Sequence, residues 1–161
     1  MQSIVESCKK SAIQEMEMFL RNFSYVPDEK LTWTVTPTSK SPIRIAAHTA
    51  LYAGRFAKMI RDQKLPAVEN LDEWVAQREA EEIAITCRKE MEKVFRAGTE
   101  EVLAALDALT PEAIESRLDS GQGWSMSMKH LMTLPGWHAT LHTGQIDFLQ
   151  TCWDDQKIYV E

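Results

Sequence analysis

The stretch HLMTLPGWHATLHTGQIDFL, from His130 to Leu149, combines a helical pattern with three of the chain's four histidines. Apolar and histidine residues recur along it at intervals of three and four. This spacing predicts one amphipathic helix that begins near Ser125 or Ser127 and ends near Trp153. Its stripe consists of Leu131, Leu134, His138, Leu141, His142, Gln145, Leu149 and Cys152. Pro135-Gly136 falls inside this helix, so we expect a kink or a break there.

Three more segments upstream show the same helical period, and turn-forming residues separate them. Ser41 before Pro42 is a typical helix start, because serine can cap free amides and proline tolerates the first turn. Thr110 before Pro111 predicts a further short helix for the same reason. The expected long helices cover residues about 2–22, 42–63 and 78–108, with a helical turn at 71–75 leading into the last of them.

The remaining segments predict loops. Residues 31–35 (LTWTV) could form a short strand, but no partner strand is evident. At 161 residues, 44% of them apolar, the chain has the size and composition of one globular domain over 1–161. The sequence therefore predicts an all-α fold, a four-helix bundle with one or two long connections.

Composition excludes several classes of function. The chain has 18 basic and 24 acidic residues and a net charge of -6, and its lysines and arginines are scattered, so we expect no nucleic-acid partner. The N-terminal sequence lacks the pattern of a signal peptide, and no run of 18 apolar residues predicts a membrane span. Three widely spaced cysteines favour reduced thiols over a disulfide framework. We therefore expect a cytoplasmic protein.

The histidines suggest a metal site. His138 and His142 are four residues apart, so both side chains project from one helix face, about one turn apart. Two imidazoles placed this way can bind one ion. A third ligand must come from another helix, and His48 lies on the apolar face of the helix that begins at Pro42. The sequence predicts that His48, His138 and His142 bind one divalent metal ion.

Three histidines without an evident fourth protein ligand would leave a coordination position open for water or substrate, as in catalytic zinc sites. Such a site needs neutral imidazoles, so metal occupancy should fall in acid. The alternative interpretation treats the three histidines as structural, since a histidine on an apolar helix face is usually a hydrogen-bonded core residue.

Three other residues are candidates for the pocket or for supporting contacts. Gln145, one turn beyond His142, could orient an imidazole or equally serve as a packing amide. Tyr52, one turn beyond His48, could line the pocket or fill the core. His130 lies close to the same face as His138, and we expect a supporting or structural role for it rather than a metal ligand.

These residues resemble the DinB-like superfamily, which includes the YfiT-type metal-dependent hydrolases and thiol transferases. The family's last helix has a His, three residues, a second His and then a Gly-Gln pair, which here correspond to His138, His142 and Gly144-Gln145. The family's other histidine follows a Ser/Pro helix start and a short apolar run, as His48 does in SPIRIAAHTALY. Thr143 stands where the family commonly has an arginine.

The resemblance implies a bundle of up-down-down-up topology with zinc, nickel or a similar metal on the three histidines, and often a homodimer. It also implies metal-dependent transfer of a low-molecular-weight thiol, such as bacillithiol, mycothiol or glutathione, to a small-molecule substrate, or else a metal-dependent hydrolysis. Thr143 and Pro135-Gly136 favour an alternative on the same scaffold, a non-catalytic, stress-associated protein that binds a metal or a small molecule.

Overall fold

The computed structural model describes residues 3–159 and is mostly helical. The elements are α1 (Ile4–Ser24), the short 3-10 helix η1 (Asp28–Lys30), α2 (Pro42–Asp62), α3 (Leu71–Ala84), α4 (Arg88–Asp107), α5 (Pro111–Glu115), β1 (Arg117–Asp119), β2 (Ser125–Ser127) and α6 (Met128–Cys152). Within the described residues, no helix is both long and apolar enough to cross a bilayer.

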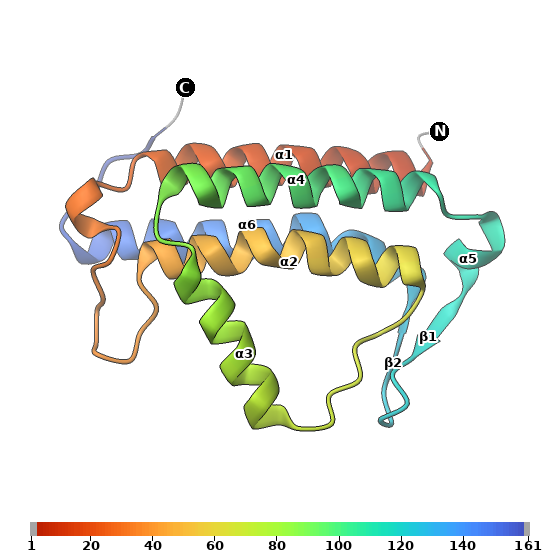
Figure 1. Ribbon diagram of the computed structural model, residues 1–161. Coiled ribbons are helices and arrows are strands. Elements are labelled where there is room, and N and C mark those ends of the chain that lie inside the picture. Colours follow the sequence, from red (N-terminus) through yellow and green to blue (C-terminus); the bar gives the residue numbers. More distant parts are fainter. Residues whose placement is uncertain (1–2, 160–161) are drawn as a thin grey trace.

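The four longest helices lie alongside one another (Figure 1). α1 and α4 form one layer, and α2 and α6 form the other. α2 packs mainly against α4, and α1 packs mainly against α6. α3 leaves the bundle at a steep angle, and a long segment connects its start to the end of α2 (Figure 1). The α2/α6 layer therefore has one face toward the bundle interior and another toward the side on which α3 lies.

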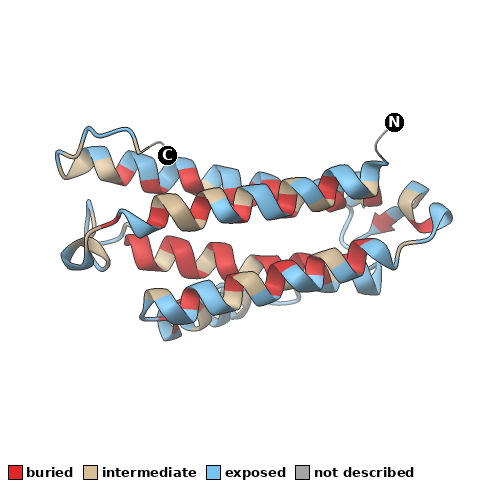
Figure 2. Cartoon of the chain, turned by 90° about the horizontal axis from the view of Figure 1, so that it is seen from above, coloured by how far each residue is buried: buried red, intermediate tan, exposed pale blue. Residues whose placement is uncertain are grey.

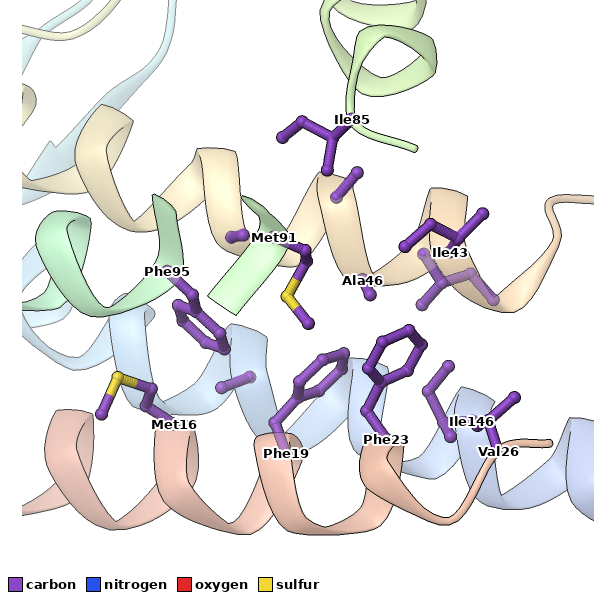
Figure 3. Packing of buried hydrophobic residues seen from close by; sticks show 14 of the residues in the cluster. Met16, Phe19, Phe23, Val26, Ile43, Ala46, Ile85, Met91, Phe95 and Ile146 are labelled. Carbon is purple, nitrogen blue, oxygen red and sulfur yellow. The ribbon is translucent and has the colours of Figure 1, made fainter. Parts of the chain in front are cut away.

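The core follows from the apolar stripes predicted for the long helices. Buried residues line the inner faces of the bundle, and exposed residues cover the outer faces (Figure 2). In α1 the buried positions are Cys8, Ala12, Met16, Phe19 and Phe23, which recur three or four residues apart, as the predicted helical period requires. The rings of Phe19 and Phe23 stack at 6.1 Å, and Phe95 from α4 meets Phe19 edge-on at 5.7 Å (Figure 3). The predicted helical pattern of this segment is thus confirmed, except that its first residue, Gln2, lies outside the described residues.

Small residues let the helix pairs approach closely. A Cβ atom on Gly98 of α4 would lie 2.8 Å from the backbone nitrogen of Gly54 and 2.9 Å from Cβ of Ala53, both in α2. A Cβ atom on Gly136 of α6 would lie 3.2 Å from the backbone carbonyl carbon of Ser11 in α1. Glycine at these two positions therefore fixes how closely α2 approaches α4 and α1 approaches α6.

Two predicted helix starts are confirmed. α2 begins at Pro42 with Ser41 as its N-cap residue, although the Ser41 side chain makes no capping hydrogen bond. α5 begins at Pro111, and Thr110 Oγ1 accepts a hydrogen bond from the Ala113 amide at 3.2 Å. Fixed proline geometry and a capping hydroxyl are local signals, which explains why sequence alone locates these starts.

The single helix predicted over 78–108 is wrong. The chain leaves the helical conformation at Ile85 and re-enters it after Cys87, so α3 and α4 are separate helices. Ile85 is buried in the core, whereas Ile83 and Cys87, which a continuous helix would place on the same face as the buried Met91, are exposed. Burial of Ile85 requires the chain to turn here, because a continuous helix would have kept Ile83 and Cys87 on its inner face.

The strand suggested at 31–35 is also wrong, because that segment is a turn followed by irregular backbone. The strands are β1 and β2, an antiparallel pair that the sequence reading missed. Their connection contains Gly121 and Gly123, both with positive φ (72° and 84°), which glycine adopts without strain. Strands of three residues are too short to show a sequence period.

Of the kink or break expected at Pro135-Gly136, the break is absent, because α6 continues through both residues. Pro135 and Gly136 are buried, and Gly136 lies against Ser11 of α1. Close packing of α6 on α1 thus supports the helix across a residue that lacks an amide hydrogen. The two histidines that follow remain on one continuous helix.

Candidate metal centre

Three of the four histidines lie together where α2 meets α6. His48 comes from α2, and His138 and His142 come from successive turns of α6. His138 Nε2 lies 3.3 Å from His48 Nε2 and 3.0 Å from His142 Nε2. One potential ligand atom from each of the three residues falls within 4.8 Å of the others. The structure therefore brings together the three residues predicted as ligands, and this group could hold a metal ion.

The outer nitrogens of two of these rings have oxygen partners. His48 Nδ1 lies 2.7 Å from Glu82 Oε1, and His142 Nδ1 lies 2.7 Å from Gln145 Oε1. An ionised carboxylate and an amide oxygen only accept hydrogen bonds, so both Nδ1 atoms carry the hydrogen and donate it. In the neutral rings, Nε2 of His48 and of His142 then presents a lone pair toward His138.

This arrangement fits a cation. His138 Nε2 can donate a hydrogen to only one of the two lone pairs that face it, and without a hydrogen it adds a third lone pair. One divalent ion between the rings would satisfy all three nitrogens at once. Two nitrogens bound to a tetrahedral zinc at roughly 2.0–2.1 Å would be roughly 3.3–3.4 Å apart. The observed nitrogen separations of 3.0 and 3.3 Å come close to this value.

Glu82 is the carboxylate that orients His48, and it is only 2% exposed. Lys40 Nζ donates to its Oε2 at 2.7 Å, and Arg44 Nη2 donates to the same atom at 3.3 Å. Burial alone would raise the pKa of Glu82, but the hydrogen bonds from His48 and Lys40 outweigh it and lower the pKa to about 2. Glu82 is therefore ionised at neutral pH and accepts from His48.

Burial keeps two of the imidazoles neutral. Desolvation, with smaller contributions from the charges of His142, His48 and Arg55, lowers the pKa of His138 to about 2. Burial also lowers the pKa of His142, although its hydrogen bond to Gln145 acts in the opposite direction. Both rings are therefore unprotonated near neutral pH, which is the state that binds metal.

An aromatic ring covers one side of the histidine group. The Tyr52 ring centroid lies 4.4 Å from that of His48 and 4.9 Å from that of His138. The guanidinium carbon of Arg55 lies 4.6 Å from the centroid of the same ring. Tyr52 thus contacts both the histidine group and a cationic side chain.

The other candidates fall in different places. Gln145 and Tyr52 both contact the histidine group, whereas His130 is exposed and lines a separate hollow with Ser11 and Trp137. Thr143, whose position was compared with an arginine in the sequence analysis, is buried. Its Oγ1 donates to the Ala139 carbonyl at 2.9 Å. No charged side chain therefore occupies the position directly after His142.

Sequence reasoning missed Glu82 and its two cationic partners, Lys40 and Arg44. Glu82 belongs to a run of charged residues in α3, and that run reads as an ordinary solvated face. Among the residues within helix α3, it is the only one fully buried. A helix whose sole buried residue is a carboxylate gives no apolar period that could have marked the position.

Comparison with known proteins places these observations in a family. The DinB superfamily profile matches residues 11–146. No curated protein matches the sequence. Among solved structures, a DinB-like protein from Bacillus subtilis aligns with a TM-score of 0.66 at 15% identity, covering 95% of this chain and 96% of that one.

The mycothiol-dependent maleylpyruvate isomerase is also similar in structure. It aligns with a TM-score of 0.65 at 13% identity, covering 91% of this chain and 63% of that one. A histidine-to-alanine variant of that isomerase gives a TM-score of 0.66 at 10% identity over the same shares. Likeness at these identities concerns the fold, and the sequence profile covers most of the chain, including all three clustered histidines. The chain belongs to the DinB superfamily.

Proposed function

We propose that this protein is a metal-dependent enzyme in which His48, His138 and His142 bind one divalent ion, zinc or nickel. The observation that carries this proposal is the convergence of the three Nε2 atoms, with separations of 3.3 and 3.0 Å along the group. Glu82 and Gln145 hold two of the rings with Nε2 inward, and burial keeps His138 and His142 neutral.

The reaction we propose is transfer of a low-molecular-weight thiol, such as bacillithiol, mycothiol or glutathione, to a small electrophilic substrate. In it the thiol loses its proton to water, its sulfur bonds to an electrophilic carbon, and a leaving group departs with the electrons of the broken bond. A divalent ion supplies Lewis acidity, which lowers the pKa of a neighbouring thiol or water. The structural likeness to an isomerase that depends on mycothiol supports this choice.

The protein's own residues would prepare the site. Glu82 and Gln145 fix the hydrogens of two imidazoles at Nδ1, so that Nε2 is free for the ion. Lys40 and Arg44 neutralise Glu82 and hold it in place. Tyr52 contacts two of the rings. Three protein ligands leave room for a substrate atom, as in catalytic zinc sites.

The decisive experiment combines metal analysis with turnover. Plasma mass spectrometry of the purified protein should find about one zinc or nickel per chain, absent from His138→Ala and His142→Ala but retained in the control His130→Ala. The metal-loaded protein should accelerate conjugation of one of the three thiols to 1-chloro-2,4-dinitrobenzene. A wild-type protein that takes up neither zinc nor nickel refutes the metal site.

Metal-loaded protein that does not conjugate any of the three thiols refutes the transferase. Hydrolysis of a panel of esters and amides would then identify a hydrolase.

A non-catalytic binding protein on the same scaffold is the second candidate. The observation that favours it is Thr143, which is buried and hydrogen-bonded to Ala139, so no cationic side chain follows His142. Such a protein would bind metal at the same histidines without turnover. Reproducible turnover that disappears in His142→Ala would exclude it.

Four features belong to this proposal as expectations. They are one domain over 1–161, up-down-down-up order of the bundle helices, a homodimer and a cytoplasmic location. The first three are accessible to limited proteolysis, an experimental structure and light scattering of the purified protein. Cell fractionation tests the fourth.

A further inference from the structure

A cavity of about 530 Å³ lies beside the histidine group, between the second half of α2, the segment that follows it and α3. Its volume is within the range of small-molecule sites. The side chains important for its chemistry are Tyr52, Arg55, Lys58, Lys64, Trp74 and Arg78. Figure 1 shows the connecting segment between the end of α2 and the start of α3.

The cavity carries an excess of positive charge. Arg55, Lys58, Lys64 and Arg78 line it, and Asp62 is the single acidic residue in the lining. Glu81 lies outside the lining and pairs with both arginines. Even with Glu81 included, four cations face two carboxylates, in a chain whose net charge is -6. The local field therefore favours an anion.

Two buried donors in this cluster have no acceptor. Arg55 Nη1 and Arg78 Nε are inaccessible to solvent and make no hydrogen bond to any described residue. Because both atoms are closed to solvent, the oxygen atoms of a ligand would reach them only after a small movement of the side chains, and such a contact would remove the cost of the unsatisfied N–H groups. Arginine donors suit oxyanions because their planar fork can bind two oxygens.

The rest of the wall is aromatic and apolar, and it is held in position. Arg78 lies over the Trp74 ring, with 5.0 Å from the guanidinium carbon to the centroid. Leu65 of the connecting segment is buried in the core. The Gln122 side chain, in the turn between β1 and β2, donates to the Val68 carbonyl at 2.6 Å and accepts from the Val68 amide at 3.4 Å. Trp74 and Leu65 thus give the cavity an aromatic and apolar surface next to its cations.

Tyr52 joins the cavity to the histidine group. Its ring lines the cavity, lies under the Arg55 guanidinium at 4.6 Å and lies within 4.9 Å of the His138 ring. A molecule anchored at Arg55 therefore lies one aromatic ring away from the candidate metal centre.

We propose that this cavity binds the substrate through a carboxylate at Arg55 and Arg78, with a flat apolar portion against Trp74. The inference names the substrate class of the proposed enzyme and in that sense rests on the proposed function. It assigns the cavity to the organic anion and leaves the thiol to the metal centre.

The test is calorimetric titration of the zinc-loaded full-length protein with phenylacetate and with its neutral analogue phenylacetamide. Phenylacetate should bind at least about 10-fold more tightly, the ratio that corresponds to about 1.4 kcal/mol. Arg55→Gln should weaken phenylacetate binding by about 10-fold, since it removes a charge-assisted hydrogen bond. Equal affinity for the two compounds overturns the inference.

Matched variants make the result specific. Lys58→Gln, at an exposed position, should weaken phenylacetate binding by about 2-fold without a risk to folding. Arg96→Gln removes the same charge at the contact of α1 with α4 and should leave binding unchanged. Equal effects of Arg55→Gln and Arg96→Gln would show that only net charge matters, and would overturn the inference.

Two further arms separate this inference from the proposed function. His142→Ala, which should lack metal, should still bind phenylacetate. Loss of phenylacetate binding in this variant would show that the anion binds at the metal ion, and would overturn the inference. A thiol without a carboxylate, such as 2-mercaptoethanol, should not compete with phenylacetate, and competition would assign the cavity to the thiol. A protein without metal that still prefers phenylacetate would refute the proposed function and leave the anion site standing.

Discussion

The interior of the bundle and the contact between α3 and the bundle differ in the kind of side chain that they contain. Between α1, α2, α4 and α6 most buried side chains are apolar, with Phe19, Phe23 and Phe95 packed ring against ring. Under α3, buried and half-buried charged groups make the contacts: Glu82 pairs with Lys40 and Arg44, and Glu81 pairs with Arg55.

This difference in polarity assigns the two regions different roles: the apolar core stabilises the fold, and the charged contact orients a residue of the candidate site. Burial of apolar surface is favourable in any orientation, so the core holds the helices together without fixing the direction of a particular polar group. Hydrogen bonds between charged groups depend on direction and distance, so those of Glu82 determine how the His48 ring is turned. We therefore expect core substitutions to change the free energy of unfolding and substitutions at the α3 contact to change metal affinity.

The largest effect should come from the centre of the core. Phe19→Ala removes a ring that is 0% exposed, and it should lower the free energy of unfolding by about 3–5 kcal/mol. Phe148→Ala is the matched control, because Phe148 is 65% exposed, and it should stay within about 0.5 kcal/mol of wild type. Urea denaturation followed by circular dichroism measures both. Similar losses for the two variants would contradict the assignment of the core.

The close contact between α2 and α4 should respond to a single methyl group. Gly98→Ala places a Cβ 2.8 Å from a backbone nitrogen, whereas Gly144→Ala has no atom within 4 Å of the new Cβ. Both gain helix propensity, so the steric cost separates them. The free energy of unfolding of Gly98→Ala should lie about 1–3 kcal/mol below that of Gly144→Ala. Equal stability of the two in the same denaturation assay would show that the helices can move apart freely.

At the α3 contact, Glu82→Gln should weaken metal binding by about 10–100-fold with a smaller effect on folding, because His48 loses its carboxylate partner. Glu79→Gln, at an exposed position on the same helix, should leave metal affinity unchanged. Competition with a chromogenic zinc chelator gives both affinities. If Glu82→Gln binds zinc as tightly as wild type, the hydrogen bond to His48 has no part in metal binding.

Acid should weaken the metal-free protein through His138. Its pKa is about 2 in the folded protein, against 6.5 for an ordinary histidine, so between these pH values the unfolded chain binds a proton that the folded chain does not. The free energy of unfolding then falls with decreasing pH, by about 1.4 kcal/mol per pH unit below 6.5. From pH 7.5 to 5.5, chelator-treated wild type should lose about 1.4 kcal/mol more than His138→Gln. Equal losses in denaturation curves would place a protonated His138 in the folded protein.

Much of the fold was accessible from sequence because its signals are local. The helical periods of α1 and α2 and the helix starts at Pro42 and Pro111 depend only on neighbours in the chain. The errors arose where a tertiary contact overrides local pattern. Burial of Ile85 separates α3 from α4, and packing of Gly136 on Ser11 carries α6 through Pro135.

The candidate site divides in the same way. Sequence by itself determined that His138 and His142 share one helix face, and that His48 lies on the inner side of another helix, because helical period fixes direction within an element. Tertiary structure alone decided that Glu82, 34 residues from His48, accepts its hydrogen bond, and that His48 and His138, 90 residues apart, meet at 3.3 Å. It also decided that the cationic cavity lies beside them. Such contacts depend on the path of the connecting segments and on the angle of α3, and no residue spacing records either of these.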